Sequence, residues 1–297
     1  MLRETYLKKM SINNQNSKAI GTDIINVDTV RGCNNGCESC YAKRNCSLSV
    51  RHFDEPVLVE LFLGKVAIDK YYRFGNFGDP ATDWAHTERM VKGHGFDLEK
   101  SFFVTKLQNA DGFSGLLKHL QVSIDPLIPD HFFKTEDNIL KIMSRFPDTN
   151  IVLRVRSVRS EDHIINTLQQ RAIELANEND LAVLETRIRF NGIKNTFDRY
   201  KLVPEEYSFR KGYLRPKFLA RHLVGAKYHL LCDEYEKKCK GCTQCTVLLT
   251  PNWRNNWVCH RERNSTLEIE VKPSALMIAR PRGTDWRPIQ QSAAIQQ

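Results

Sequence analysis

The chain has 297 residues, of which 41% are hydrophobic, enough for one large α/β core or for one core with a small appendage. No run of about eighteen apolar residues occurs and residues 1–20 are polar, so neither a membrane span nor a secretory signal is expected. We therefore expect a cytoplasmic protein without a membrane partner. The net charge of +9 suits an anionic partner such as nucleic acid, although solubility alone accounts for many basic proteins.

The first predicted strand, Thr22–Val30, runs into a loop that carries three cysteines. Cys33, Cys37 and Cys40 are separated by three and then two residues, so their thiolates can hold three corners of a soft metal centre. A [4Fe–4S] cluster with three protein ligands keeps one iron open for a substrate or cofactor, whereas a structural zinc site is normally closed by four. A zinc loop or three unrelated thiols are the alternatives.

This CxxxCxxC spacing after a strand resembles the radical S-adenosylmethionine (SAM) superfamily. The resemblance implies a partial (β/α)6 barrel, a [4Fe–4S] cluster on the three cysteines whose open iron binds SAM, and a reductant such as flavodoxin or ferredoxin. In that family, reductive cleavage of SAM gives a 5′-deoxyadenosyl radical that abstracts hydrogen from the substrate. The chain departs from the family at Ser39, where an aromatic residue is usual, and Tyr41 follows the last cysteine instead. No catalytic residue is assigned.

A glycine-rich turn, Phe74–Pro80, follows the second predicted strand, Lys70–Phe74. Glycines let the backbone approach a ligand closely, and carbonyls or a carboxylate can accept hydrogen bonds from an ammonium group. In the radical SAM family, a turn at this point receives the amino group of SAM. The resemblance thus implies SAM contacts from Gly75, Asn76, Gly78 and Asp79. The turn can equally serve as the start of a helix with Asp83 as its N-cap.

Strands alternate with helices as far as Phe190. Further strands are predicted at Phe102–Leu107, Leu120–Ile124, Ile151–Val158 and Leu181–Phe190. Helices are predicted between them, one capped by Thr135 and stopped by Pro147, another capped by Ser160. Six strands separated by helices argue for an α/β fold with a parallel sheet, either doubly wound or curled into a partial barrel, and periodicity does not choose between these.

The last predicted strands carry charged side chains on one face. Arg154 and Arg156 lie opposite an apolar face, and Glu185 does so in the next strand. These charges can line a solvated sheet face. Strands in a βα array, however, are normally covered by helices on their apolar faces. The charged side chains would then point into a barrel lumen near the cysteine loop. We therefore expect a SAM and substrate site that includes Ser123, Asp125, Arg154, Arg156 and Glu185.

Residues 21–190 are thus the predicted core, and 191–297 form an extension with a second cysteine group. Its members are Cys232, Cys239, Cys242, Cys245 and Cys259. Three of these at two-residue gaps resemble a ferredoxin cluster, for which Cys232 or Cys259 can be the fourth ligand. A second [4Fe–4S] cluster is expected, as in many radical SAM enzymes, with a zinc site as the alternative. A half-buried strand is predicted at Thr266–Lys272.

Two function classes follow. The chain looks most similar to phage-associated and spore-photoproduct-lyase-like radical SAM proteins, which implies a nucleotide or DNA base as substrate, in a hypermodification pathway that rearranges a base side chain. Arginines and tyrosines in residues 191–231 can stack on bases and pair with phosphates, or belong to an amphipathic helix. Radical modification of a peptide is the alternative enzyme. The second class is a non-enzymatic, zinc-stabilised nucleic-acid-binding protein.

Overall fold

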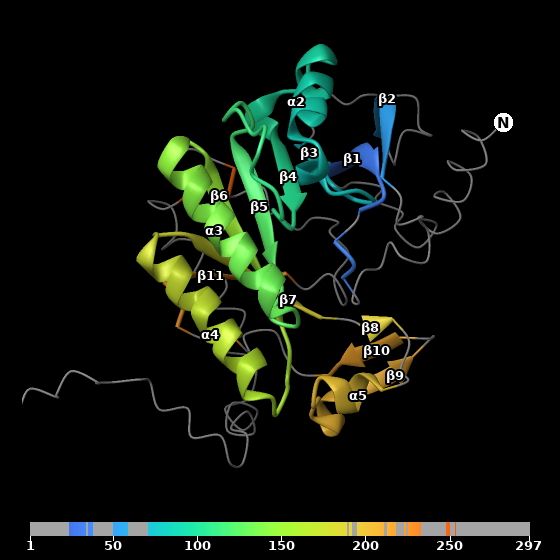
Figure 1. Ribbon diagram of the computed structural model, residues 1–297, viewed down its shortest axis with the longest axis vertical. Coiled ribbons are helices and arrows are strands. Elements are labelled where there is room, and N and C mark those ends of the chain that lie inside the picture. Colours follow the sequence, from blue (N-terminus) through green and yellow to red (C-terminus); the bar gives the residue numbers. More distant parts are fainter. Residues whose placement is uncertain are drawn as a thin grey trace, which may run out of the picture. The chain divides into compact units, whose positions relative to one another are not determined.

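The computed structural model describes residues 24–33, 35–37, 50–58, 71–188, 190–191, 195–210, 213–217, 223, 225–232, 248–249 and 253. It is an α/β structure built on an eight-stranded, mostly parallel sheet, with a second sheet of three short strands (Figure 1). All of these elements belong to the first of two units, Met1–Pro251. The second unit is Asn252–Gln297, of which only Trp253 is described.

The parallel strands are β1 (Ile24–Arg31), β3 (Tyr71–Phe74), β4 (Ser101–Thr105), β5 (His119–Ile124), β6 (Asn150–Ser157), β7 (Ala182–Arg187) and β11 (Tyr228–Cys232). At the edge, β2 (Arg51–Leu58) pairs antiparallel with β1. The helices are α2 (Trp84–Gly93), α3 (Pro129–Arg145), α4 (His163–Glu178) and α5 (Thr196–Arg199), with 3-10 turns η3 (Pro80–Thr82), η4 (Leu98–Lys100) and η5 (Pro204–Glu206). The small antiparallel sheet consists of β8 (Phe190–Asn191), β10 (Tyr213–Pro216) and β9 (Tyr207–Arg210).

The order of the strands excludes the doubly wound alternative. Along the large sheet it is β11-β7-β6-β5-β4-β3-β1-β2, so each parallel strand lies beside the next parallel strand in the chain. A doubly wound sheet needs a reversal of this order, and none occurs among the described strands. Crossovers of one hand that all run in one direction put their helices on one face.

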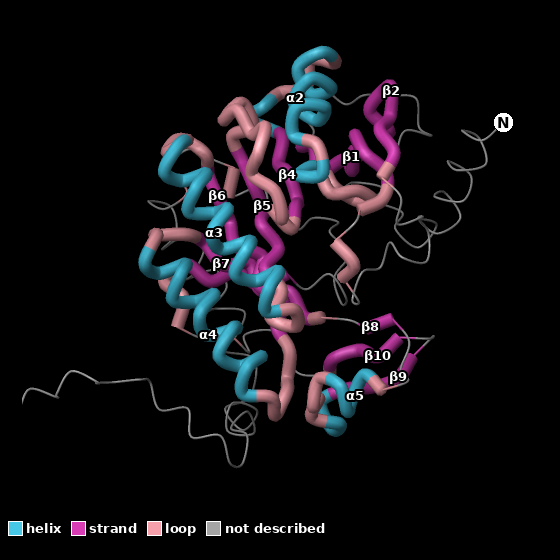
Figure 2. Tube along the Cα trace, in the orientation of Figure 1, coloured by secondary structure: helices cyan, strands magenta, loops and turns pink. Residues whose placement is uncertain are grey.

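Helices α3 and α4 lie side by side on that face (Figure 2). Their buried side chains join those of the strands in one apolar core, in which Ile139 of α3 and Leu168 of α4 pack with Val122 and Leu153. Helices are therefore present in both segments where they were predicted, and their buried residues face this core. Asp83 caps α2 as expected, and its carboxylate accepts the N–H of His86.

Two predicted caps are wrong. Helix α3 begins at Pro129, and the hydroxyl of Thr135 lies inside it, donating to the carbonyl of Lys106 at 2.8 Å. Helix α4 is capped by Asp162, whereas the hydroxyl of Ser160 donates to the carbonyl of Tyr200 at 2.5 Å. In both cases a hydroxyl suited to capping bonds a distant carbonyl instead, so local sequence alone could not place the helix start.

Six strands were predicted and all six are present, but β2, β11 and the small sheet were missed. The β11 segment lies among Arg-, Lys- and Tyr-rich residues that conceal its short apolar run, and it extends the sheet by pairing with β7. The predicted strand Thr266–Lys272 lies outside the described residues. No helix in the described part of the chain is long and apolar enough to cross a membrane.

The fully buried Gln169 joins α4 to the chain just after β6. Its amide accepts the N–H of Val158 at 2.7 Å and donates to the Val158 carbonyl at 3.1 Å. We expect Gln169→Leu to lower the free energy of unfolding by about 2 kcal/mol, because it removes the two buried hydrogen bonds between the Gln169 amide and the backbone of Val158. Urea denaturation measures this effect. The neighbouring half-buried Gln170→Leu is the control, with an expected change under about 0.5 kcal/mol, and equal losses in the two variants would contradict this role.

Candidate functional site

The cysteine loop begins directly after β1. Cys33 is partly exposed and Cys37 is buried. Both contact the backbone of one residue, since the N–H of Asn35 donates to Cys33 Sγ at 3.4 Å and Cys37 Sγ donates to the Asn35 carbonyl at 3.9 Å. Cys40 lies outside the described residues. Within the residues that are described, no group of three or more potential ligands could hold a metal ion.

Asp79 connects this loop to the glycine-rich turn and to the end of β4. Asn35 Nδ2 donates to its Oδ2 at 3.0 Å, as does the N–H of Lys106 at 2.9 Å. Thr105 Oγ1 and the N–H of Ala81 donate to Oδ1 at 2.5 and 3.0 Å. Burial raises the pKa of Asp79 despite these bonds. Because a carboxylate has about four acceptor positions, these four donors from the chain occupy Asp79. Its expected contact with SAM stays a prediction.

The glycine-rich turn packs closely against the ends of β1 and β4. A Cβ atom at Gly75, where φ is +92°, would lie 2.2 Å from the carbonyl oxygen of Val104, and one at Gly78 would lie 2.1 Å from that of Val30. The N–H of Gly32 donates to the Phe77 carbonyl at 3.2 Å. Glycine is therefore required here for close approach, and the turn lies beside the strand that leads to Cys33.

Asp28 was missed by the sequence analysis, although an acid among the apolar residues of a strand is a signal. It is 1% exposed on β1. Its Oδ1 accepts the N–H of Asn76 at 2.7 Å and that of Phe77 at 3.0 Å. Burial raises its pKa to about 7, against the lowering effects of these bonds and of the Arg73 charge. Oδ2 is buried and has no hydrogen-bond partner among the described residues.

A row of polar residues lies on the sheet face opposite the helices, at the ends of β5 and β6. Ser123 is the registered neighbour of Arg154, and Arg156 follows two residues later on the same face. Lys106 Nζ pairs with Asp125 Oδ2 at 2.9 Å. Although burial acts to raise it, the charges of Lys106 and Arg156 hold the pKa of Asp125 below its usual value. Four of the predicted site residues are thus brought together.

Glu185 is a correction, because it lies on the other face of the sheet. The register pairs Glu185 with Val155 and pairs Arg154 with Leu184. Glu185 is fully buried, and its Oε2 accepts from His229 Nε2 at 2.8 Å and from the N–H of Leu223 at 3.3 Å. Alternation shows which residues of one strand share a face, but only the register between strands shows which faces coincide.

The opposite end of the polar face is closed by apolar residues that the sequence did not indicate. Leu249 packs on Phe102 and Val104 of β4. The neighbouring carbonyl of Leu248 accepts a hydrogen bond from Asn150 Nδ2 at 2.6 Å. The polar row therefore lies at the carboxyl ends of the strands, where ligands gather in parallel α/β sheets.

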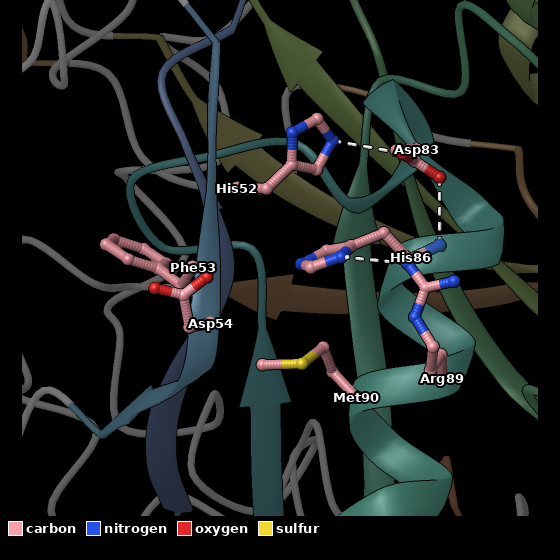
Figure 3. A pocket seen from close by; sticks show the side chains of 7 residues that line it. All are labelled: His52, Phe53, Asp54, Asp83, His86, Arg89 and Met90. Carbon is pink, nitrogen blue, oxygen red and sulfur yellow. Dashed lines mark hydrogen bonds and ion pairs between the residues drawn. The ribbon is translucent and has the colours of Figure 1, made fainter.

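A pocket of about 480 Å³ lies between β2 and α2, lined by His52, Phe53, Asp54, Asp83, His86, Arg89 and Met90 (Figure 3). His52 Nε2 lies 3.0 Å from Asp83 Oδ2. Both ring nitrogens of His86 are engaged, because Nε2 faces the Thr29 carbonyl at 3.1 Å and Nδ1 faces Arg89 at 3.3 Å. None of the predicted site residues lines this pocket, so it is not the candidate site.

The second cysteine group is described only at Cys232, the partly buried last residue of β11. Its registered neighbour on β7 is Thr186, which places Cys232 at the same carboxyl edge of the sheet as the polar row. The other four members, Cys239, Cys242, Cys245 and Cys259, lie outside the described residues.

We expect Asp28→Asn to change the pH dependence of stability. The pKa of Asp28 is about 7 in the folded chain against an ordinary 3.8, so the folded state binds more protons between those values and loses stability as pH rises through that window. Asparagine keeps the acceptor oxygen but stays neutral, and so removes up to about 4 kcal/mol of this loss. Urea denaturation should show a larger gain in stability at pH 8 than at pH 5. The surface variant Asp97→Asn is the control, and a pH-independent effect of Asp28→Asn would contradict the raised pKa.

Comparison with known proteins gives no relative from which to transfer a role. No protein-family model matches the chain, and no curated protein or solved structure matches it either.

Proposed function

We propose that the chain is a radical SAM enzyme in which Cys33, Cys37 and Cys40 hold a [4Fe–4S] cluster. When bound, the cluster would pass an electron from a reductant such as flavodoxin or ferredoxin to SAM, whose C5′–S bond would break to give methionine and a 5′-deoxyadenosyl radical that takes hydrogen from the substrate. The hydrogen bond between Asn35 and Asp79 carries the proposal, because it joins the cysteine loop to the glycine-rich turn.

The described residues have side chains and backbone groups that suit a [4Fe–4S] cluster and SAM. The two described thiols lie on the backbone of one residue, and soft thiolates at this spacing suit an iron–sulfur cluster. Asn76 and Phe77 direct their N–H groups at Asp28, which leaves the other side of the turn to carbonyls that suit an ammonium group. Arg154 and Arg156 provide positive charge for a carboxylate, and their long side chains begin on the polar face.

We extend the proposal to a partial (β/α)6 barrel. The consecutive order of β1, β3, β4, β5, β6 and β7 is the order such a barrel requires. The core lies between these strands and the helices, while the polar row lies on the opposite face. In a barrel, that face becomes the lumen. Asp125, paired with Lys106, would then present a fixed negative charge beside Arg156, suited to ribose hydroxyls or a polar substrate.

We also propose a second [4Fe–4S] cluster on Cys239, Cys242 and Cys245, with Cys232 or Cys259 as the fourth ligand. The position of Cys232 at the carboxyl edge of the sheet supports a site close to the polar row. A zinc site with four cysteine ligands uses the same residues and is the alternative.

For the substrate, we propose a nucleotide or a DNA base. On β10, Tyr213 and Arg215 share a face, while Leu214 between them packs into the apolar cluster of the small sheet. Both side chains are partly exposed, and Ser208 is the registered neighbour of Arg215. An aromatic ring beside a guanidinium suits base stacking and phosphate pairing.

The proposal predicts that Cys33→Ala abolishes SAM cleavage. The chain, reconstituted anaerobically with iron and sulfide and reduced with dithionite, should form 5′-deoxyadenosine from SAM. Cys33→Ala should lower the rate by at least about a hundredfold, because a cluster ligand is lost. Ser39→Ala, which removes no thiol, is the control. Cleavage that survived in Cys33→Ala would exclude this cluster, and about four rather than about eight irons per wild-type chain would remove the second one.

If DNA is the substrate, Arg210→Ala combined with Arg215→Ala should weaken the salt dependence of binding. Two lost phosphate contacts reduce the slope of log K against log salt concentration by about 1.4 for single strands and about 1.8 for duplex. Fluorescence anisotropy with labelled oligonucleotides measures this slope. Lys141→Ala with Arg145→Ala, on the exposed side of α3, removes the same charge elsewhere. An equal change in slope for both pairs would point to net charge alone, and no change would count against this surface.

A further inference from the structure

We propose that Asp28 is a positioning residue, which orients the turn Gly75–Gly78 so that its carbonyl groups face the ammonium group of bound SAM. This inference rests on the proposed function and goes further, because it gives a role to a residue outside the cysteine motif and outside the turn. Asp28 lies on β1, the strand that leads into the cysteine loop.

The contacts that carry the inference are short and buried. One oxygen of Asp28 accepts two successive backbone N–H groups, from Asn76 at 2.7 Å and from Phe77 at 3.0 Å. The carboxyl is 1% exposed, so water does not compete for these bonds. Because Oδ1 accepts in both protonation states, with a proton on Oδ2 when the group is neutral, the turn is held in either state.

The planar peptide bond converts these contacts into an orientation. The carbonyl of Gly75 belongs to the same peptide plane as the N–H of Asn76 and points the opposite way, and so does the carbonyl of Asn76 relative to the N–H of Phe77. Both carbonyls are therefore directed away from Asp28. A carboxylate behind two aligned peptide dipoles also polarises them, which makes each carbonyl a stronger acceptor for a cation.

Asp28 and Asp79 hold the turn in different ways. Asp79 bonds Asn35, Thr105 and Lys106 and so fixes where the turn lies between the cysteine loop and β4. Asp28 bonds two N–H groups within the turn and so fixes which way its peptides face. Loss of Asp28 should therefore weaken binding of the SAM ammonium group even where the turn itself stays in place.

The test compares SAM with an analogue in which hydrogen replaces the amino group. Isothermal titration of the reconstituted enzyme should show SAM binding at least about tenfold more tightly than the analogue, the factor that one charge-assisted hydrogen bond provides. Asp28→Ala should lower this ratio severalfold, and Asp28→Asn should keep most of it, because the amide oxygen accepts the same N–H groups. The ratio is a readout that a general loss of stability does not move.

Asp162→Ala is the matched control, because Asp162 also accepts a backbone N–H but caps α4. It should lower stability and leave the ratio unchanged. Asp28→Val, which fills the buried space, replaces Asp28→Ala if that variant does not fold. A wild-type ratio retained in folded Asp28→Ala or Asp28→Val would overturn the positioning role while leaving the proposed function intact. A wild-type chain that neither binds nor cleaves SAM would overturn both.

Discussion

Two buried carboxylates hold the glycine-rich turn between the ends of β1 and β4, the strands on either side of β3, and the arrangement of the candidate site depends on them. Burying a carboxyl is costly unless its oxygens are hydrogen-bonded. Asp79 meets this condition with four donors, whereas Asp28 uses one oxygen for two donors. Raised pKa values at both positions reflect that cost. Residues that are expensive to bury and fixed by backbone groups are typical of functional sites.

The parallel sheet separates the apolar core from the polar residues of the candidate site. On one face, strands and helices share the apolar core, and the fully buried Glu185 is tolerated there because His229 and the backbone of Leu223 bond it. On the other face, Ser123, Asp125, Arg154 and Arg156 gather at the carboxyl ends of β5 and β6. Leu249 closes the far end of that face with apolar contacts. The apolar core that stabilises the fold thus lies on one side of the sheet, and the charged side chains lie on the other.

Local patterns in the sequence predicted much of this arrangement. The six strands, the apolar faces of α3 and α4, and the Asp83 cap were predicted because alternation, helical periodicity and capping chemistry act over a few residues. The caps at Thr135 and Ser160 were wrong because their hydroxyls bond carbonyls at the ends of other elements.

By itself, the sequence determined the α/β class, the cysteine spacing and the pairing of Arg154 with Arg156 on one strand face. Only the tertiary structure decided the consecutive strand order, the separation of Glu185 from the arginines and the partnership of Asp28 with the turn. The physical reason is range. Alternation and periodicity are properties of one segment, whereas register, and the bond between Asp28 and residues 48 and 49 positions away, join segments that meet only when the sheet forms.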